Sequence, residues 1–133
     1  MKIKKINDQL SVADQITQND VSDISKAGFQ SIICNRPDAE TAGQPAYKEI
    51  EQAAMKANLP IRYLPAVSGA VTSELGQEFG KMLEELPKPV LAYCRSGMRC
   101  TTLWALSNAK TMDSATIVQT AANAGYDISA ISL

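Results

Sequence analysis

The chain has 133 residues, a net charge of −1 and a hydrophobic fraction of 45%, which is enough to bury the core of one domain without disulfides or metal. This charge excludes a general electrostatic attraction to nucleic acid or to anionic membranes, and no apolar stretch approaches the ~20 residues that cross a bilayer. The first residues do not form a signal peptide h-region, so we expect a cytoplasmic protein with a single domain over residues 1–133.

The predicted elements alternate between strands and helices along the chain. Five stretches have the short apolar character of strands: residues 3–6, 9–13, 29–35, 61–65 and 89–94. Five others have the apolar spacing or the terminal residues of helices: residues 17–28, about 47–58, 72–86, a segment from about residue 99, and 114–125. This alternation predicts an α/β fold with a mostly parallel central sheet flanked by helices. The first two strands are expected to pair at an edge of the sheet.

The chain contains no histidine and only three cysteines. The absence of histidine excludes Ser-His and Cys-His catalysis and histidine-based metal sites. Three cysteines without C-x-x-C spacing make a poor zinc site, and their odd number does not fit a disulfide scaffold. We therefore expect neither a metal nor an organic cofactor, and a nucleophile must be activated by the backbone, an arginine or a lysine.

The segment Cys94–Arg99, with the sequence CRSGMR, links a predicted buried strand to the start of a helix. Backbone N–H groups at a helix N-terminus lack intrahelical partners and can converge on an anion. Gly97 permits a close approach of the anion to the backbone, and Arg99 can donate two parallel hydrogen bonds to its oxygens. The same surroundings lower the pKa of a cysteine from ~8.5 to roughly 3.5–7.5. Cys94 is therefore the predicted nucleophile.

Residues of two loops complete the predicted anion site. Ser96 and Met98 contribute backbone N–H groups, and Arg95 is expected to point toward solvent and help to dock the anion. Arg36, in the turn-rich loop over residues 35–45, is expected to close the pocket from the neighbouring strand end.

Cys34 is a candidate redox partner of Cys94, because both residues end strands that are expected to lie side by side. Neighbouring strands are about 4.8 Å apart, and the Cα atoms of a disulfide are usually roughly 4.4–6.8 Å apart. The alternative is that Cys34 is a small core residue. Cys100 is the weaker candidate, since the first turn of the helix is expected to aim its side chain away from the pocket.

The CRSGMR loop is similar to the C-x-x-G-x-R loop of rhodanese-type sulfurtransferases, but the chain as a whole resembles another family. Its segments GFQSIICNRPDAE, GQPAYKEIEQAA, LPAVSGAVT, PVLAYCRSGMRCTTLWAL and AGYDIS resemble, in this order, the phosphatase-like domain of beta-lactamase-hydrolase-like proteins. The resemblance covers residues 2–131 and implies a protein-tyrosine-phosphatase-like fold of the dual-specificity-phosphatase kind. Some members of the family are fused to a metallo-beta-lactamase-like domain, which implies a persulfide dioxygenase as a partner.

The resemblance leaves two reactions open, and the residues favour sulfur transfer. Tyrosine phosphatases have the pattern H-C-x5-R, whereas here Tyr93 replaces the histidine and Arg99 comes one position earlier. A phosphatase also needs an acid for the leaving group, and residues 60–93 contain no aspartate. Asp38 or Glu74 must then serve as the acid, while sulfur transfer needs none.

We therefore expect a cysteine-dependent enzyme that acts on a small sulfur or phosphate oxyanion. The leading hypothesis is a sulfurtransferase that moves sulfane sulfur through a persulfide on Cys94. The alternative is a protein-tyrosine or dual-specificity-phosphatase-like hydrolase that acts through a phosphocysteine. The second alternative is a non-catalytic anion-binding or redox-sensing module. In none of these do we expect a nucleic acid or membrane partner.

Overall fold

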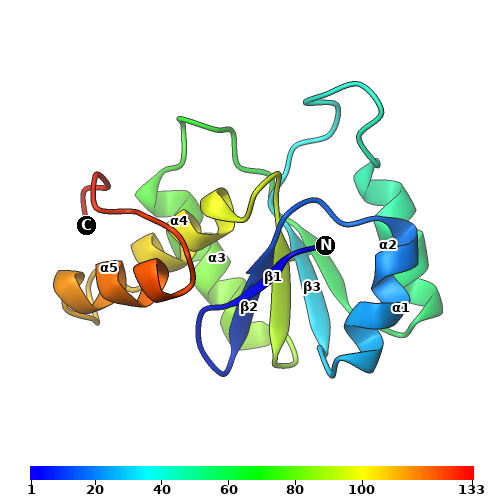
Figure 1. The fold of residues 1–133 in the computed structure, drawn as a ribbon, viewed down its shortest axis with the longest axis horizontal. Helices are drawn as coiled ribbons and strands as arrows, with labels where there is room; N and C mark the ends of the chain where they lie inside the picture. The colour runs from blue at the N-terminus through cyan, green and yellow to red at the C-terminus, as the bar shows by residue number, and fades with distance from the viewer.

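The computed structural model describes residues 1–133 and contains one five-stranded sheet with helices on both faces (Figure 1). Its strands are β1 (Ile3–Lys5), β2 (Leu10–Ala13), β3 (Ser31–Cys34), β4 (Ile61–Tyr63) and β5 (Val90–Tyr93). The strand order is β1-β2-β5-β3-β4. Only β1 and β2 pair antiparallel, and the other neighbours pair parallel. The predicted α/β fold with a mostly parallel sheet is therefore confirmed. The first two strands pair at one edge, as expected, with β1 as the edge strand and β2 inside the sheet, and β4 forms the other edge.

Five helices connect or follow the strands: α1 (Gln18–Lys26), α2 (Tyr47–Lys56), α3 (Ser73–Glu85), α4 (Met98–Ser107) and α5 (Ser114–Asn123). Side chains at the helix starts stabilise N–H groups that have no intrahelical partner. The Thr72 hydroxyl accepts a hydrogen bond from the N–H of Leu75 at 3.2 Å. At α1, the Asp20 carboxylate accepts one from the N–H of Thr17 at 2.8 Å. None of the helices combines the length and the apolar character needed to cross a membrane.

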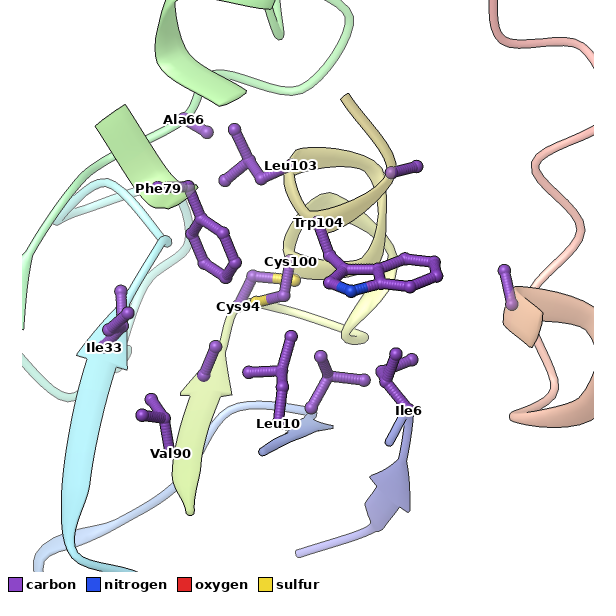
Figure 2. Packing of buried hydrophobic residues seen from close by; sticks show 14 of the residues in the cluster. Ile6, Leu10, Ile33, Ala66, Phe79, Val90, Cys94, Cys100, Leu103 and Trp104 are labelled. Atoms are coloured by element: carbon purple, nitrogen blue, oxygen red, sulfur yellow. The ribbon is translucent and has the colours of Figure 1, made fainter. Parts of the chain in front are cut away.

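The sheet separates two apolar clusters, because successive side chains of a strand point to opposite faces. On one face, α1 and α2 cover alternate residues of the central strands, among them Cys34 and Tyr93. On the other face, α3, α4 and α5 cover the intervening residues, among them Ile33 and Cys94. The ribbon shows these two groups of helices on opposite sides of the strands (Figure 1). The second cluster is the larger one and lies directly beneath the Cys94 loop (Figure 2).

Helices α3 and α4 pack closely because α3 has glycines where it meets α4. A Cβ atom at Gly76 would lie 2.6 Å from the Cβ of Leu106 and 3.4 Å from the carbonyl oxygen of Leu103. A Cβ atom at Gly80 would lie 3.1 Å from the Cβ of Ser107. The small residues therefore let α4 lie against α3, and this packing sets the position of the first turn of α4 at the end of β5.

Candidate active site at the end of strand β5

The central strand β5 ends beside the carboxyl ends of two parallel neighbours. The chain just after β5 is held on one side by a hydrogen bond from the N–H of Cys94 to the carbonyl of Ala13, at 3.2 Å. On the other side, the N–H of Asn35 donates to the carbonyl of Tyr93 at 2.8 Å. Helix α4 begins four residues after Cys94, at Met98. The loop over residues 94–97 therefore lies where ligands bind in parallel sheets, outside the carboxyl ends of the strands.

The sulfur of Cys94 is surrounded by hydrogen-bond donors. The N–H of Gly97 donates to it at 3.0 Å, and further hydrogen bonds come from the Cys100 thiol and from the backbone N–H groups of Ser96 and Cys100. The Cys100 hydrogen bond is the largest influence, and together these donors outweigh burial and lower the pKa of Cys94 to about 5. Burial and the same contact raise the pKa of Cys100 well above its ordinary value. The proton therefore stays on Cys100, and Cys94 is a thiolate at neutral pH.

The loop has its shape because of Gly97 and Tyr126. Gly97 has a φ of 94°, in the region that favours glycine, and a Cβ atom there would lie 2.2 Å from the hydroxyl of Tyr126. That hydroxyl donates a hydrogen bond to the carbonyl of Ser96 at 2.9 Å. The segment after α5 thus holds the Cys94 loop from outside. Tyr126 was not identified from the sequence, because nothing in its local pattern links it to a loop some thirty residues earlier.

Arg99 is held by a carboxylate that the sequence analysis also missed. Its Nη1 donates to Oε2 of Glu40 at 2.7 Å and to the carbonyl of Ala66 at 2.9 Å. Its Nη2 donates to Oε1 of Glu40 at 2.8 Å. A guanidinium has five N–H groups, so the Nε–H and one Nη2–H remain as a second pair of parallel donors. Glu40 therefore orients Arg99 by one edge and leaves another edge able to bind an oxyanion.

Arg36 acts on this arrangement through Glu40. Its side chain is only 5% exposed, and its Nε donates to Oε1 of Glu40 at 2.9 Å. Its other nitrogens donate to Gln15 at 3.0 Å and to Thr41 at 3.3 Å. The hydrogen bond from Arg99, followed by that from Arg36, lowers the pKa of Glu40 to about 2. The structure thus places Arg36 beside Glu40 with its donors directed to the protein, and its predicted part in binding the anion stays a prediction.

The remaining residues of the predicted anion loop face outward. Arg95 and Ser96 line a hollow of about 380 Å³ together with Lys2, Lys4 and Tyr126. On the other flank of the loop, Met98 and Arg99 line a hollow of about 410 Å³ with Val71 and Leu106. Arg95 is exposed, as predicted, while Cys94 has no exposed surface and lines neither hollow.

The structure places Asp38 at the start of α2. Its Oδ1 accepts a hydrogen bond from the N–H of Tyr47 at 2.8 Å, and its own N–H donates to the hydroxyl of Tyr63 at 3.0 Å. The rings of Tyr47 and Tyr63 stack with their centroids 4.5 Å apart. Asp38 therefore stabilises the N-terminus of α2. Its role as an acid stays a prediction.

Cys34 does not take the place expected for a redox partner of Cys94. In the register of β3 and β5, Cys34 pairs with Tyr93 and not with Cys94. The one-residue offset puts the two cysteines in the clusters on opposite faces of the sheet. The thiol of Cys34 donates instead to the carbonyl of Arg36 at 3.4 Å. It is Cys100, expected to point away, whose sulfur lies beside that of Cys94 (Figure 2).

The family comparison identifies most of the chain. Residues 2–111 match the family described as beta-lactamase hydrolase-like protein, phosphatase-like domain. The beta-lactamase hydrolase-like protein of Agrobacterium fabrum is 35% identical over 109 residues, and that of Xylella fastidiosa (strain Temecula1) is 33% identical over 107. These alignments cover 82% and 80% of this chain but only 25% of either relative. The chain thus spans about a quarter of the length of these relatives.

Solved structures share the fold over nearly the whole chain. A protein from Neisseria meningitidis Z2491, described as a "putative phosphatase", is 32% identical with a TM-score of 0.87, and the match covers 96% of this chain and 92% of that one. The kinase associated phosphatase is 12% identical with a TM-score of 0.74, covering 94% and 84%. At this lower identity the likeness shows the fold alone, and it confirms the predicted phosphatase-like architecture.

Proposed function

Because the chain belongs to the phosphatase-like domain family of beta-lactamase hydrolase-like proteins, we propose that it is a cysteine-dependent hydrolase of phosphate esters that acts through a phosphocysteine on Cys94. One observation carries the proposal: the Cys94 sulfur is held as a thiolate by converging N–H groups at the start of α4. The proposal reverses the order of the two reactions weighed from the sequence. The residues alone favour sulfur transfer, whereas the phosphatase-like fold supports the hydrolytic alternative.

The loop geometry supports binding of a tetrahedral oxyanion above Cys94. The first N–H groups of α4 have no partner four residues earlier, and the helix dipole favours negative charge at this end. The Nε and Nη2 edge of Arg99, left free by Glu40, adds two parallel donors. In this arrangement the phosphate is held with its phosphorus facing the Cys94 sulfur.

The reaction then proceeds in two displacements. The Cys94 thiolate attacks phosphorus, an S–P bond forms, and the bond from phosphorus to the leaving oxygen breaks. Water next attacks the phosphocysteine, releases inorganic phosphate and regenerates the thiolate. Arg99 and the loop N–H groups stabilise the negative charge that develops on the phosphoryl oxygens in both steps. For the leaving-group proton, Asp38 and Glu74 remain the proposed donors, and Asp38 could serve only after releasing the N–H of Tyr47.

Entry of the substrate requires a side-chain movement, since Cys94 is fully buried. Met98 and Arg99, in the first turn of α4, both line the hollow of about 410 Å³. We assign this hollow to the leaving group of the substrate. Its wall combines hydroxyl groups, such as that of Thr102, with apolar side chains, such as that of Leu106. This lining suits an organic group without charge.

Sulfur transfer is kept as a second candidate because of a specific observation at Asp38. Its carboxylate accepts a hydrogen bond from the N–H of Tyr47 at the N-terminus of α2. This hydrogen bond leaves Asp38 poorly suited to protonate a leaving group over Cys94. A sulfane sulfur donor such as thiosulfate needs no acid, since sulfite leaves as a stable anion. Under this alternative Cys94 carries a persulfide, and a persulfide dioxygenase is the proposed partner.

The two candidates are distinguished by the group that Cys94 carries. We expect the purified protein to release p-nitrophenol from p-nitrophenyl phosphate, and acid-quenched samples to contain a phosphate-bearing Cys94 peptide. The Cys94→Ser variant should do neither. A protein that takes up sulfur from thiosulfate at Cys94, and releases no p-nitrophenol above the level of the Ser variant, would overturn the hydrolytic proposal.

A further inference from the structure

We propose that Cys94 and Cys100 form a reversible disulfide when the protein meets a peroxide, which makes this pair an oxidation site that protects the nucleophile. The proposal does not rest on the hydrolytic reaction, because it concerns only the two thiols and the oxidant.

The loop brings the two sulfurs together from different elements. Cys94 directly follows β5, and Cys100 lies in the first turn of α4. Because residues 95–99 turn back over the strand end, both side chains point into the same cluster, where the two sulfurs lie side by side (Figure 2). A hydrogen bond joins them. Leu103, Trp104 and Phe79 surround the pair and hold it in place (Figure 2).

The chemistry starts at Cys94, the only one of the three thiols whose pKa is lowered. Its thiolate attacks an oxygen of hydrogen peroxide, the O–O bond breaks, and the products are a sulfenic acid on Cys94 and hydroxide, which is protonated to water. The sulfur is oxidised by two electrons and the peroxide is reduced. Because Cys94 has no exposed surface, the peroxide must reach it by a side-chain movement like the one that admits the substrate, and a molecule little larger than water needs less movement.

Cys100 then resolves the sulfenic acid. Its sulfur attacks the sulfur of Cys94, the S–S bond forms and the S–O bond breaks. The hydroxide that leaves takes the proton of Cys100 and becomes water. In total, two thiols and one peroxide give one disulfide and two waters. Burial keeps Cys100 protonated, so the leaving hydroxide is the base that completes this step.

Cys34 provides a matched control inside the same chain. It is a buried, free cysteine like Cys100, but it lies in the cluster on the other face of the sheet. Burial raises the pKa of its thiol to about 11, and its proton is engaged by the carbonyl of Arg36 at 3.4 Å. The proposal therefore requires that Cys34 stay reduced while the other two cysteines pair.

The test is disulfide mapping of the wild-type protein after a short treatment with hydrogen peroxide. Trypsin separates the three cysteines into the peptides 27–48, 82–95 and 100–110, because it cleaves after Lys and Arg but not before Pro. We expect a cross-linked species of peptides 82–95 and 100–110, lighter than their sum by two hydrogens and lost on addition of dithiothreitol. The Cys34→Ala variant should give the same product.

The Cys100→Ala variant tests the protective role. Without the resolving thiol, we expect at least a tenfold increase in the fraction of Cys94 that reaches the sulfinic or sulfonic state, which dithiothreitol does not reverse. Circular dichroism checks that both alanine variants are folded. The mapping of the wild type decides the proposal even if Cys100→Ala is unstable. A disulfide that includes Cys34, or overoxidation of Cys94 in wild type with Cys100 still free, would overturn it.

Discussion

Cys94 combines complete burial with an ionised thiol, and the ionisation depends on donors of one loop. Its sulfur accepts hydrogen bonds from the thiol of Cys100 and from the N–H groups of Ser96, Gly97 and Cys100. No histidine or lysine takes part in this activation. The loop therefore performs the task that a general base performs for other thiol nucleophiles.

We predict that alkylation of Cys94 by iodoacetamide has a midpoint near pH 5, the value to which its pKa is lowered. Below this pH the Cys94 sulfur is protonated. The rate of alkylation should then fall about tenfold for each pH unit, because only the thiolate reacts. The rate can be measured by peptide mass in the native protein, and Cys34 serves as a control that stays unmodified. A midpoint near 9.0, the ordinary reference pKa of this thiol, would contradict the proposed activation.

Glu40 is the carboxylate between two guanidinium groups, and we predict that Glu40→Gln lowers both stability and activity. The change leaves Arg36 and Arg99, whose side chains are 5% and 10% exposed, without their common carboxylate, because the Gln amide is neutral and keeps only one acceptor oxygen. Loss of a partner for a buried donor costs about 1–3 kcal/mol, measurable by urea unfolding. The turnover of p-nitrophenyl phosphate should fall because Arg99 is no longer oriented.

The pH dependence separates this effect from a general loss of structure. The pKa of Glu40 is lowered from 4.5 to about 2 in the folded protein, so its ion pair contributes fully above pH 4.5 and is lost as the pH falls toward 2. The stability difference between wild type and Glu40→Gln should shrink over this window. Glu78→Gln, at an exposed position of α3, is the control for removing a carboxylate outside the site.

The shape of the cysteine loop depends both on the backbone freedom of Gly97 and on its close contact with Tyr126. Alanine substitutions at two glycines separate these two contributions. Gly97 and Gly125 have φ values of 94° and 103°, where an alanine costs roughly 1–2 kcal/mol. Only at Gly97 would the new Cβ meet a neighbour, the Tyr126 hydroxyl at 2.2 Å, while none lies within 4 Å of Gly125. We predict that both alanine variants lose stability and that only Gly97→Ala loses turnover.

A double-mutant cycle tests whether the Tyr126 contact causes the losses in Gly97→Ala. In this variant the Tyr126 hydroxyl must leave the carbonyl of Ser96. Adding Tyr126→Phe should therefore reduce stability and turnover less in Gly97→Ala than in wild type. Stability from urea unfolding and turnover give the two readouts. Equal effects of Tyr126→Phe in both backgrounds would show that the contact does not hold the loop.

The pairing of α3 with α4 is a second element-scale constraint on the site. We predict that Gly76→Ala is destabilising, because a Cβ at 2.6 Å from that of Leu106 forces the helices apart, at a cost of about 1–3 kcal/mol. The gain in helix propensity, about 1 kcal/mol, does not offset it. Gly80→Ala, where the nearest atom is at 3.1 Å, should be close to neutral. Thermal unfolding compares the two, and equal losses would contradict the predicted difference.

At the scale of the whole molecule, the sequence pattern predicted the strand and helix order and the Cys94 loop, since both depend on local apolar runs and on turn residues. It did not predict which cysteine lies beside Cys94. Two cysteines that end neighbouring strands share a face only if the register pairs them, and here Cys34 pairs with Tyr93. The register depends on how the strands dock, which a single sequence does not contain.

The residues that hold the site from a distance were missed for a related reason. Glu40 lies in a loop without periodicity and reaches Arg99, 59 positions later. Tyr126 follows the last helix and reaches Ser96, 30 positions earlier. Such contacts depend on the complete packing of elements, whereas Gly97 could be predicted because its constraint is local.

The ionisation of Cys94 links the site to the stability of the whole molecule, which is the basis of the last prediction. The pKa of its thiol is about 5 in the folded protein and 9.0 as the ordinary reference. Between these values the unfolded chain binds more protons than the folded one, so the free energy of unfolding should rise with pH from about 5 to about 9. Cys94→Ser removes the titrating group and should flatten this rise. Urea unfolding of both proteins at several pH values gives the comparison, under reducing conditions that keep Cys100 free. Parallel pH profiles for the two proteins would mean that Cys94 is not the thiolate on which the site is built.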